Sequence, residues 1–206
     1  MIEVVKNFLS SDLARFCMLM LEHECQIQDR VGNHASFTPL SSKVFDYKYQ
    51  FFAPAWTEMI MAKKLNHMQQ ITKRQLYPVR SLARKYLKGD SMPEHTDTLF
   101  LEWNATIHLG GTKWNIYFDD KPYLLMPGDA IVYKGTVPHY RKEFKGRSCY
   151  QAMIHYSRKK EDLYSGKKYF KMASYAFLGL SLYMFIKKHP NHSKSLLVQA
   201  NELIRY

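Results

Sequence analysis

Cysteine, glycine and proline are scarce in this sequence, and their scarcity excludes several classes of protein. The 206 residues include 3 cysteines, an odd number without repeated spacing, so a disulfide framework is not expected. With 9 glycines and 8 prolines against a hydrophobic fraction of 46%, the chain is neither collagen-like nor a disordered linker. The opening Met1-Ile2-Glu3 lacks the charged-then-apolar pattern of a secretory signal. We therefore expect an ordered globular protein in a reducing, cytoplasmic compartment.

Long hydrophobic runs are missing as well. The most apolar stretch, residues 173–186, has 14 residues and includes Gly179 and Ser181. A helix that crosses a bilayer needs about 20 predominantly apolar residues, so no transmembrane segment is expected. The stretch predicts a buried helix, with a helix lying on a membrane surface as the alternative.

Acidic residues are outnumbered by basic ones. The chain has 30 Lys and Arg against 18 Asp and Glu, which gives a formal net charge of +12. Such an excess concentrates anionic partners such as nucleic acid, acidic proteins or carboxylate metabolites. The basic residues nevertheless occur as scattered pairs: Lys63-Lys64, Lys73-Arg74, Arg141-Lys142, Lys159-Lys160, Lys167-Lys168 and Lys187-Lys188. A solvated basic surface is the simplest interpretation, and an acidic or nucleic-acid partner stays open.

A chain of this length is expected to form one domain, and its first part is predicted to be helical. A β-rich run at residues 2–5 leads to Ser10-Ser11-Asp12, residue types that cap helices. Residues 31–52 are turn-rich and polar, and Pro54 then begins a second predicted helix. The apolar faces of the two helices are Leu13, Phe16, Cys17, Met20 and Leu21, and Trp56, Met59, Ile60, Leu65 and Met68. The helices thus fall within residues 10–76.

Short β-rich runs follow in residues 77–156. They span residues 79–87, 103–109, 114–118, 123–125, 130–133 and 148–156, and turn residues such as Pro127-Gly128-Asp129 separate them. Because no helix-length segment lies between the runs, the pattern favours an antiparallel sandwich or barrel, a mostly β core with flanking helices, over βαβ units. Helical patterns return beyond Ser157 and predict a C-terminal helical extension, residues 159–206, packed on the core.

A candidate metal site lies within the β-rich region. His95 and Asp97 are two residues apart in an extended segment, so both side chains point to the same side and can reach one ion. With 9 His and 18 acidic residues, about 0.8 such triplets are expected by chance, so this pair alone is weak evidence. His139, after a Pro-Gly-Asp turn and a predicted strand, supplies a third ligand, with a surface loop histidine as the alternative. Two histidines and one carboxylate leave coordination positions open on an iron.

Two further residues are candidates for binding an anionic co-substrate. Arg147 opens the last predicted strand, and a guanidinium suits a carboxylate because the two can form a bidentate pair. Tyr86 can add a phenol hydrogen bond to the same carboxylate. The alternatives are a surface ion pair for Arg147 and a core position for Tyr86, and Arg141 is the nearest rival cation.

These segments together resemble the Fe(II)/2-oxoglutarate-dependent dioxygenase superfamily, and within it they are most similar to the prolyl 4-hydroxylase catalytic domains. The similarity covers residues 2–158 and is carried by Val4-Val5-Lys6-Asn7-Phe8-Leu9-Ser10, by the segment from Tyr86 to His95-Thr96-Asp97, and by Pro127-Gly128-Asp129-Ala130 before His139. It implies a double-stranded β-helix, or jelly-roll, over residues 77–158. It also implies Fe(II) on His95, Asp97 and His139, 2-oxoglutarate on Arg147 and Tyr86, dioxygen as oxidant, and ascorbate as an optional reductant.

The same resemblance identifies candidate substrate residues. Met153 stands where the family has a tryptophan, and His155 stands where it has a histidine that contacts the substrate. Arg147 follows His139 by 8 residues, a shorter connection than in the family, and the strand that lines the substrate side is replaced by a segment that contains Trp114. His155 and Trp114 are therefore the candidate substrate residues, and a peptide or protein with a prolyl-type target is the favoured substrate.

Several functions remain open at this point. The first is hydroxylation of a peptidyl C–H bond with release of succinate and CO2, and the presence of Asp97 favours hydroxylation because halogenating relatives lack the carboxylate. The second is a nucleic-acid-directed oxygenase, for which Trp114, Tyr117 and Tyr140 are candidate stacking residues. A small-molecule hydroxylase and an inactive jelly-roll binding module are the others.

Overall fold

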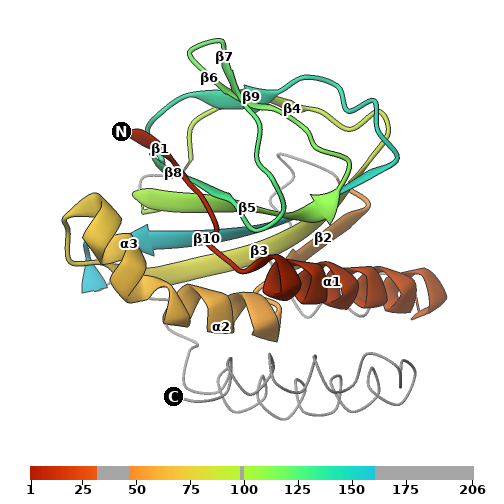
Figure 1. Cartoon of the computed structure of the whole chain (residues 1–206), viewed down its shortest axis with the longest axis horizontal. Helices are drawn as coiled ribbons and strands as arrows, with labels where there is room; N and C mark the ends of the chain where they lie inside the picture. The colour runs from red at the N-terminus through yellow and green to blue at the C-terminus, as the bar shows by residue number, and fades with distance from the viewer. Residues whose placement is uncertain (32–46, 98–99, 161–206) are drawn as a thin grey trace.

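The computed structural model describes residues 1–31, 47–97 and 100–160, and two antiparallel β-sheets form its centre (Figure 1). The major sheet has the strand order β1-β8-β5-β10-β3-β2, and the minor sheet has the order β4-β9-β6-β7. The strands are β1 (Ile2–Val5), β2 (Tyr49–Phe52), β3 (Tyr77–Leu87), β4 (Met92–His95), β5 (Trp103–Gly111), β6 (Ile116–Phe118), β7 (Lys121–Tyr123), β8 (Ala130–Lys134), β9 (His139–Arg141) and β10 (Ser148–Ser157). This arrangement confirms the predicted double-stranded β-helix.

Strand β10 shows how the major sheet separates two interiors. Successive side chains of a strand point to opposite faces. Gln151, Met153 and His155 face the space between the two sheets and line a cavity there. Ala152 and Ile154 face the other way and belong to a large apolar cluster beneath the helices. Both faces of the strand are buried. The face toward the helices is apolar, and the face toward the cavity also carries the polar residues Gln151 and His155.

In the part of the chain that the structure describes, three helices cover the outer face of the major sheet (Figure 1): α1 (Ser11–Val31), α2 (Ala55–Lys63) and α3 (Leu65–Thr72). The hydroxyl of Ser10 accepts a 3.3 Å hydrogen bond from the backbone N–H of Leu13, as expected of a helix cap. Pro54 stands at the N-cap of α2. The single helix expected after it is interrupted at Lys64, where α2 ends and α3 begins.

Three strands were not predicted from the sequence. β2 lies in a region that we interpreted as turn-rich, and it pairs with β3 at the edge of the major sheet. β4 and β9 each have at most 4 residues and pair with each other. Strands this short have too few residues for a recognisable alternation, so only their partners reveal them.

Several expectations concern other parts of the chain or the protein's surroundings. The three cysteines are free and buried. No helix among the described residues is long and apolar enough to cross a membrane. The predicted C-terminal extension, with its apolar stretch at 173–186, lies outside the described residues, so the proposed boundary at residue 158 stays a prediction.

Candidate metal and co-substrate site

Pairing between two short strands brings the two candidate histidine ligands together. β4 and β9 are antiparallel neighbours in the minor sheet, and His95 lies directly opposite His139 in their register. The two imidazole rings are 4.3 Å apart between centroids. Residues far apart in the sequence therefore become neighbours through the strand register.

Asp97 is held beside the histidines by contacts with two other segments. Its backbone N–H donates a 2.8 Å hydrogen bond to the carbonyl of Gly135. The side-chain amide of Asn104, on β5, donates to Oδ2 of Asp97 at 2.5 Å. A side chain at position 135 would collide with the backbone oxygen of Leu101, so glycine is required for this close approach. Asp97 is thus held by β5 and by the residue that follows β8, two strands of the major sheet.

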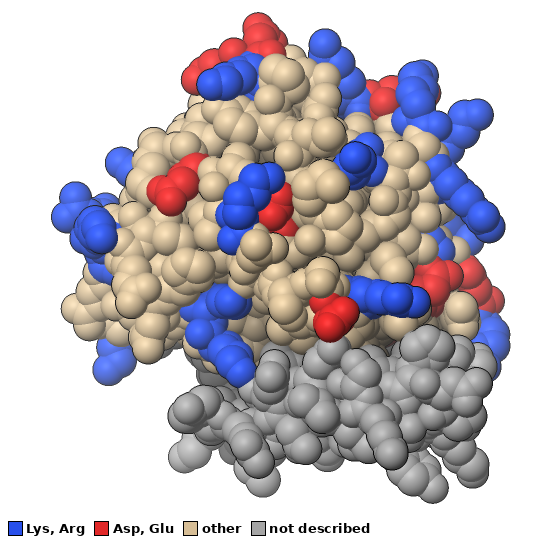
Figure 2. Space-filling view, viewed as in Figure 1, with Lys and Arg blue, Asp and Glu red and all other residues tan. Residues whose placement is uncertain are grey.

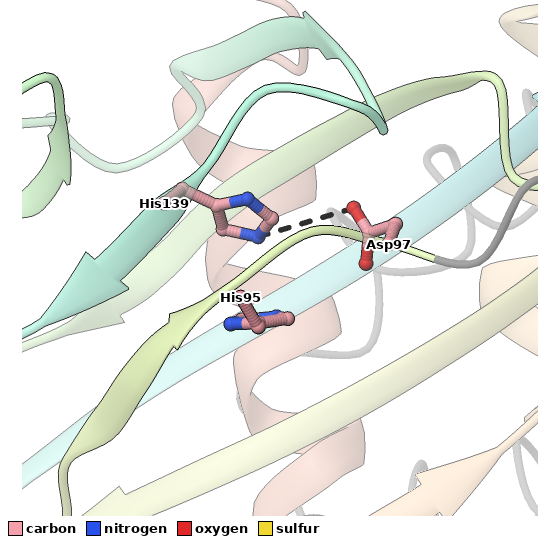
Figure 3. Close-up of side chains that lie close together, drawn as sticks. All are labelled: His95, Asp97 and His139. Atoms are coloured by element: carbon pink, nitrogen blue, oxygen red, sulfur yellow. Dashed lines mark ion pairs between the residues drawn. The ribbon is translucent and has the colours of Figure 1, made fainter.

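The geometry of the three side chains suits one metal ion (Figure 3). Their candidate ligand atoms all lie within 4.8 Å of one another, and Nε2 of His139 is 3.9 Å from Oδ2 of Asp97. Nδ1 of His95 lies 2.9 Å from the carbonyl oxygen of Pro93, and Nδ1 of His139 lies 3.0 Å from that of Val137. Hydrogen bonds of this kind fix the tautomer and present Nε2 to a metal.

The electrostatics of the site also fit a divalent cation. Burial lowers the pKa of His139 to about 4, so this ring is neutral near pH 7, as a metal ligand must be. Burial raises the pKa of Asp97, while His95, Arg80 and Arg84 oppose the rise. A bound dication would stabilise the buried carboxylate. Two histidine nitrogens and one carboxylate form the set that non-haem Fe(II) oxygenases use.

A cavity of about 230 Å³ between the sheets contains this triad. Arg141 lines the cavity and is only 2% exposed. Its guanidinium donates to the carbonyl oxygen of Trp114 at 2.8 Å and to Oε1 of Gln151 at 3.0 Å. Tyr86, which is 1% exposed, lines the same cavity from β3. The structure therefore places a buried cation and a phenol near the metal triad.

Comparison with solved structures shows the fold. The chain is similar to a Pseudomonas putida prolyl-4-hydroxylase, with 17% identity, a TM-score of 0.51, and coverage of 77% of this chain and 92% of that one. It is also similar to a viral collagen prolyl hydroxylase from Paramecium Bursaria Chlorella virus-1, solved with 2-oxoglutarate. The identity is 11%, the TM-score is 0.53, and the match covers 75% of this chain and 94% of that one. A third similar structure is EctD from S. alaskensis, solved with 2-oxoglutarate and 5-hydroxyectoine. The identity is 11%, the TM-score is 0.56, and the match covers 76% of this chain and 71% of that one. The chain has the fold of these oxygenases. No protein-family model matches the sequence, and no curated protein matches it significantly.

Arg147 does not lie where the sequence suggested. Its side chain is exposed and is absent from the cavity lining. Arg147 is an even number of residues from Gln151 and Met153, so the sequence suggested that it shares their face of the strand. However, β10 begins only at Ser148, and the arginine lies before the start of the strand. Arg141, the rival cation, lines the cavity instead.

The two candidate substrate residues differ in position. His155 is buried and lines the cavity, and its Nδ1 lies 2.9 Å from the backbone oxygen of Arg80. Trp114 packs against the ring of Tyr86 at 5.0 Å and is not part of the cavity lining. The indole N–H of Trp114 donates to the carbonyl oxygen of Lys142 at 3.0 Å. Trp114 thus supports the cavity wall from behind.

Sequence reasoning missed three polar side chains of the site. Asn104 binds Asp97, and Arg80 and Arg84 line the cavity from β3. A signal for the arginines was available, because residues 80, 82, 84 and 86 share one face of a strand and Tyr86 was already a candidate. Asn104 gave no comparable signal, since its partner depends on contact between distant segments.

Proposed function

We propose that this chain is a non-haem Fe(II)- and 2-oxoglutarate-dependent dioxygenase that hydroxylates a C–H bond. The observation that carries the proposal is the presence of His95, Asp97 and His139 in one cavity with a deeply buried arginine, Arg141. Iron and 2-oxoglutarate, when bound, would supply oxidative chemistry with dioxygen and release succinate and CO2. The protein's own residues hold the metal, anchor the co-substrate and exclude water.

Arg141 is the residue that we propose binds the far carboxylate of 2-oxoglutarate, in place of Arg147. Its two hydrogen-bond acceptors, the carbonyl of Trp114 and the side chain of Gln151, are neutral. No ion pair among the described residues joins it to a carboxylate. Burial lowers the pKa of Arg141, which reflects the cost of a desolvated cation. A carboxylate would offset that cost with charge-assisted hydrogen bonds.

Tyr86 is the second residue that we propose for the same anchor. Its ring lies edge-on to the rings of Tyr47 and Trp114, with both centroid distances 5.0 Å, so the side chain is held in one orientation. The phenol oxygen accepts a 3.2 Å hydrogen bond from Arg84. A phenol whose oxygen accepts from a cation keeps its proton available for a carboxylate. Tyr86 therefore stays a proposed co-substrate residue.

The substrate of first choice for testing is a peptidyl, prolyl-type group. Support comes from the sequence resemblance, from His155 in the cavity, and from the fold that the chain shares with two prolyl hydroxylases. A small molecule is the second candidate, because EctD has the same fold and was solved with 5-hydroxyectoine. A nucleic-acid substrate is less well supported: on the face that Figure 2 shows, basic residues are scattered among acidic ones and form no single patch.

Metal and co-substrate binding test the proposal directly. We expect the purified chain to bind one Fe(II) or Mn(II), to bind 2-oxoglutarate only when the metal is present, and to form succinate only with Fe(II) and dioxygen. A screen of Pro-containing peptides, free amino acids and oligonucleotides for stimulated succinate release would then identify the substrate class. A chain that binds neither metal nor 2-oxoglutarate would instead be a jelly-roll binding module.

A further inference from the structure

A second cavity, of about 310 Å³, lies at one end of the major sheet, and basic side chains from three separate segments line it. Arg74 lies between α3 and β3, Lys134 is the last residue of β8, and Arg158 directly follows β10. The strands β8, β5, β10 and β3 are consecutive neighbours in the sheet. Their ends therefore bring together three cations that are far apart in the sequence.

The backbone that forms the wall of this cavity is held in place by hydrogen bonds. The N–H of Gly135 donates to the carbonyl oxygen of Glu102 at 3.0 Å, and the N–H of Val137 donates to that of Lys134 at 3.0 Å. Trp103 lies opposite Lys134 in the register of β5 and β8. The turn after β8 and the start of β5 are thus fixed against each other, so the cavity wall is preformed.

The positive charge of this cavity is only partly neutralised. Nε of Arg158 lies 2.5 Å from Oε2 of Glu102, which is the one carboxylate among the described lining residues. The ammonium of Lys134 lies 5.6 Å from the ring centre of Trp103. No ion pair within the described part of the chain involves Lys134 or Arg74. Three cations against one carboxylate leave an excess of two positive charges on the wall.

We propose that this cavity binds a phosphate group, either inorganic phosphate or the phosphate of a small phosphate ester. A phosphate group carries a charge of about −1.5 to −2 at pH 7 and offers three acceptor oxygens, which matches the excess charge of the wall. The guanidinium of Arg74 can bind phosphate through two parallel hydrogen bonds, and Lys134 supplies an ammonium. The exposed side chain of Thr136 adds a hydroxyl donor. A carboxylate brings a single charge and is the weaker ligand.

The second cavity adjoins the metal cavity but differs from it in its polar residues. Leu101 lines both cavities. Lys134 and Thr136 flank Gly135, whose carbonyl oxygen accepts the hydrogen bond from the backbone N–H of Asp97. Bound phosphate would therefore lie beside the turn that holds a proposed metal ligand. The inference goes beyond the proposed function and does not rest on it, because phosphate binding can be measured without a metal.

The test uses the full, metal-free chain, because a bound metal would itself attract phosphate. Line broadening in phosphorus NMR measures the binding of inorganic phosphate and of methyl phosphate at one low ionic strength, since salt screens exposed charges. Acetate is added as a monoanionic competitor. The variants are Arg74→Gln, Lys134→Gln and the double variant. Two exposed cations elsewhere provide matched controls, Arg15→Gln on α1 and Lys88→Gln after β3.

We expect the wild type to bind at least one of the two phosphates and acetate to compete poorly. Each single variant should weaken phosphate binding at least about three-fold, and the double variant at least about ten-fold, because charge-assisted contacts are lost. Lys134→Arg keeps the charge and should stay within about two-fold of the wild type. Both control variants should bind like the wild type. Tighter binding of methyl phosphate than of inorganic phosphate would identify an ester as the ligand, and the reverse would identify free phosphate.

Several results would overturn the inference. They are the absence of binding of either phosphate, competition by acetate as strong as that by phosphate, and equal losses in the control variants. Phosphate binding that persists in the double variant but disappears in Arg141→Gln would place the anion in the metal cavity and would also overturn it. Failure of the chain to bind Mn(II) and 2-oxoglutarate would overturn the proposed function alone.

Discussion

The guanidinium of Arg141 donates a 3.0 Å hydrogen bond to Oε1 of Gln151 and so joins the minor sheet to the major sheet inside the cavity. Arg141 comes from β9, the strand that also carries His139, and Gln151 comes from β10. A metal ligand and a buried cation therefore project from one three-residue strand. This relationship supports the assignment of the co-substrate anchor to Arg141.

Replacing Arg141 should weaken 2-oxoglutarate binding strongly. Loss of a charge-assisted contact to a carboxylate costs about 2 to 4 kcal/mol, so Arg141→Ala should raise the dissociation constant by roughly thirty-fold to nearly a thousand-fold. Arg141→Lys, which keeps the charge, should have a milder effect. Isothermal titration of the Mn(II)-loaded protein measures both, and thermal unfolding checks that each variant is folded.

Arg147→Ala is the matched control for Arg141, because it removes an arginine whose side chain is exposed. Its 2-oxoglutarate affinity should stay close to that of the wild type. A large rise in the dissociation constant for the Arg147 variant alone would restore the assignment made from the sequence. No rise in either variant would count against 2-oxoglutarate as the co-substrate.

Removing any of the three proposed metal ligands should abolish metal-dependent activity. In His95→Ala, Asp97→Ala and His139→Ala the remaining two ligands cannot complete the facial set, so Fe(II)-dependent succinate formation should disappear while the fold persists. His67→Ala is the control, since His67 stacks on Phe8 at 5.3 Å and does not line the cavity. Metal titration and a succinate assay give the result. Full activity in any of the three variants would refute its role as a ligand.

Asn104 should tune metal affinity without touching the metal. Its amide donates to Oδ2 of Asp97 at 2.5 Å, and the loss of such an orienting partner typically lowers metal affinity by about 10- to 100-fold. We expect Asn104→Ala to show this loss in a Mn(II) titration. Asn66→Ala, a change at an exposed asparagine of α3, should leave the affinity unchanged. If both variants bind Mn(II) like the wild type, the hydrogen bond to Asp97 has no role in metal binding.

The metal-free protein should lose stability as the pH falls below about 6.5, the ordinary pKa of histidine. Burial lowers the pKa of His108 to about 4 and that of His155 to about 3. Between these values and about 6.5 each of these histidines binds more protons in the unfolded chain than in the folded one, so its contribution to the free energy of unfolding decreases as pH falls. Each pKa unit corresponds to about 1.4 kcal/mol.

Urea unfolding at pH 7.5 and pH 4.5 measures this dependence. His155→Gln removes one of the buried histidines that titrate in this range, so the difference in unfolding free energy between the two pH values should be smaller in this variant than in the wild type. An identical difference in both proteins would show that His155 is not buried in its neutral form. The comparison within one pair of pH values cancels the contribution of carboxylates, which both proteins share.

The sequence by itself determined which residues are candidate metal ligands and on which face of a predicted strand they lie. Short β-rich runs separated by turn residues predicted the longer strands within residues 77–156. The spacing of His95 and Asp97 put two candidate ligands on one side of an extended segment. The turn and predicted strand before His139 made it a candidate third ligand, and the family resemblance supported it and specified the β core as a jelly-roll. The structure confirms the fold. All of these features depend on short-range periodicity or on motifs, which a single sequence displays directly.

Only the tertiary structure decided which residues meet. The register of β4 and β9 places His95 opposite His139, and the point where β10 begins leaves Arg147 in solvent while Arg141 lies in the cavity. The alternation of side chains along a strand tells which face of the sheet a residue occupies. It does not tell where the strand ends or which strand it pairs with. Those are fixed by pairing between distant segments, because a register is set by the packing of both sheets together.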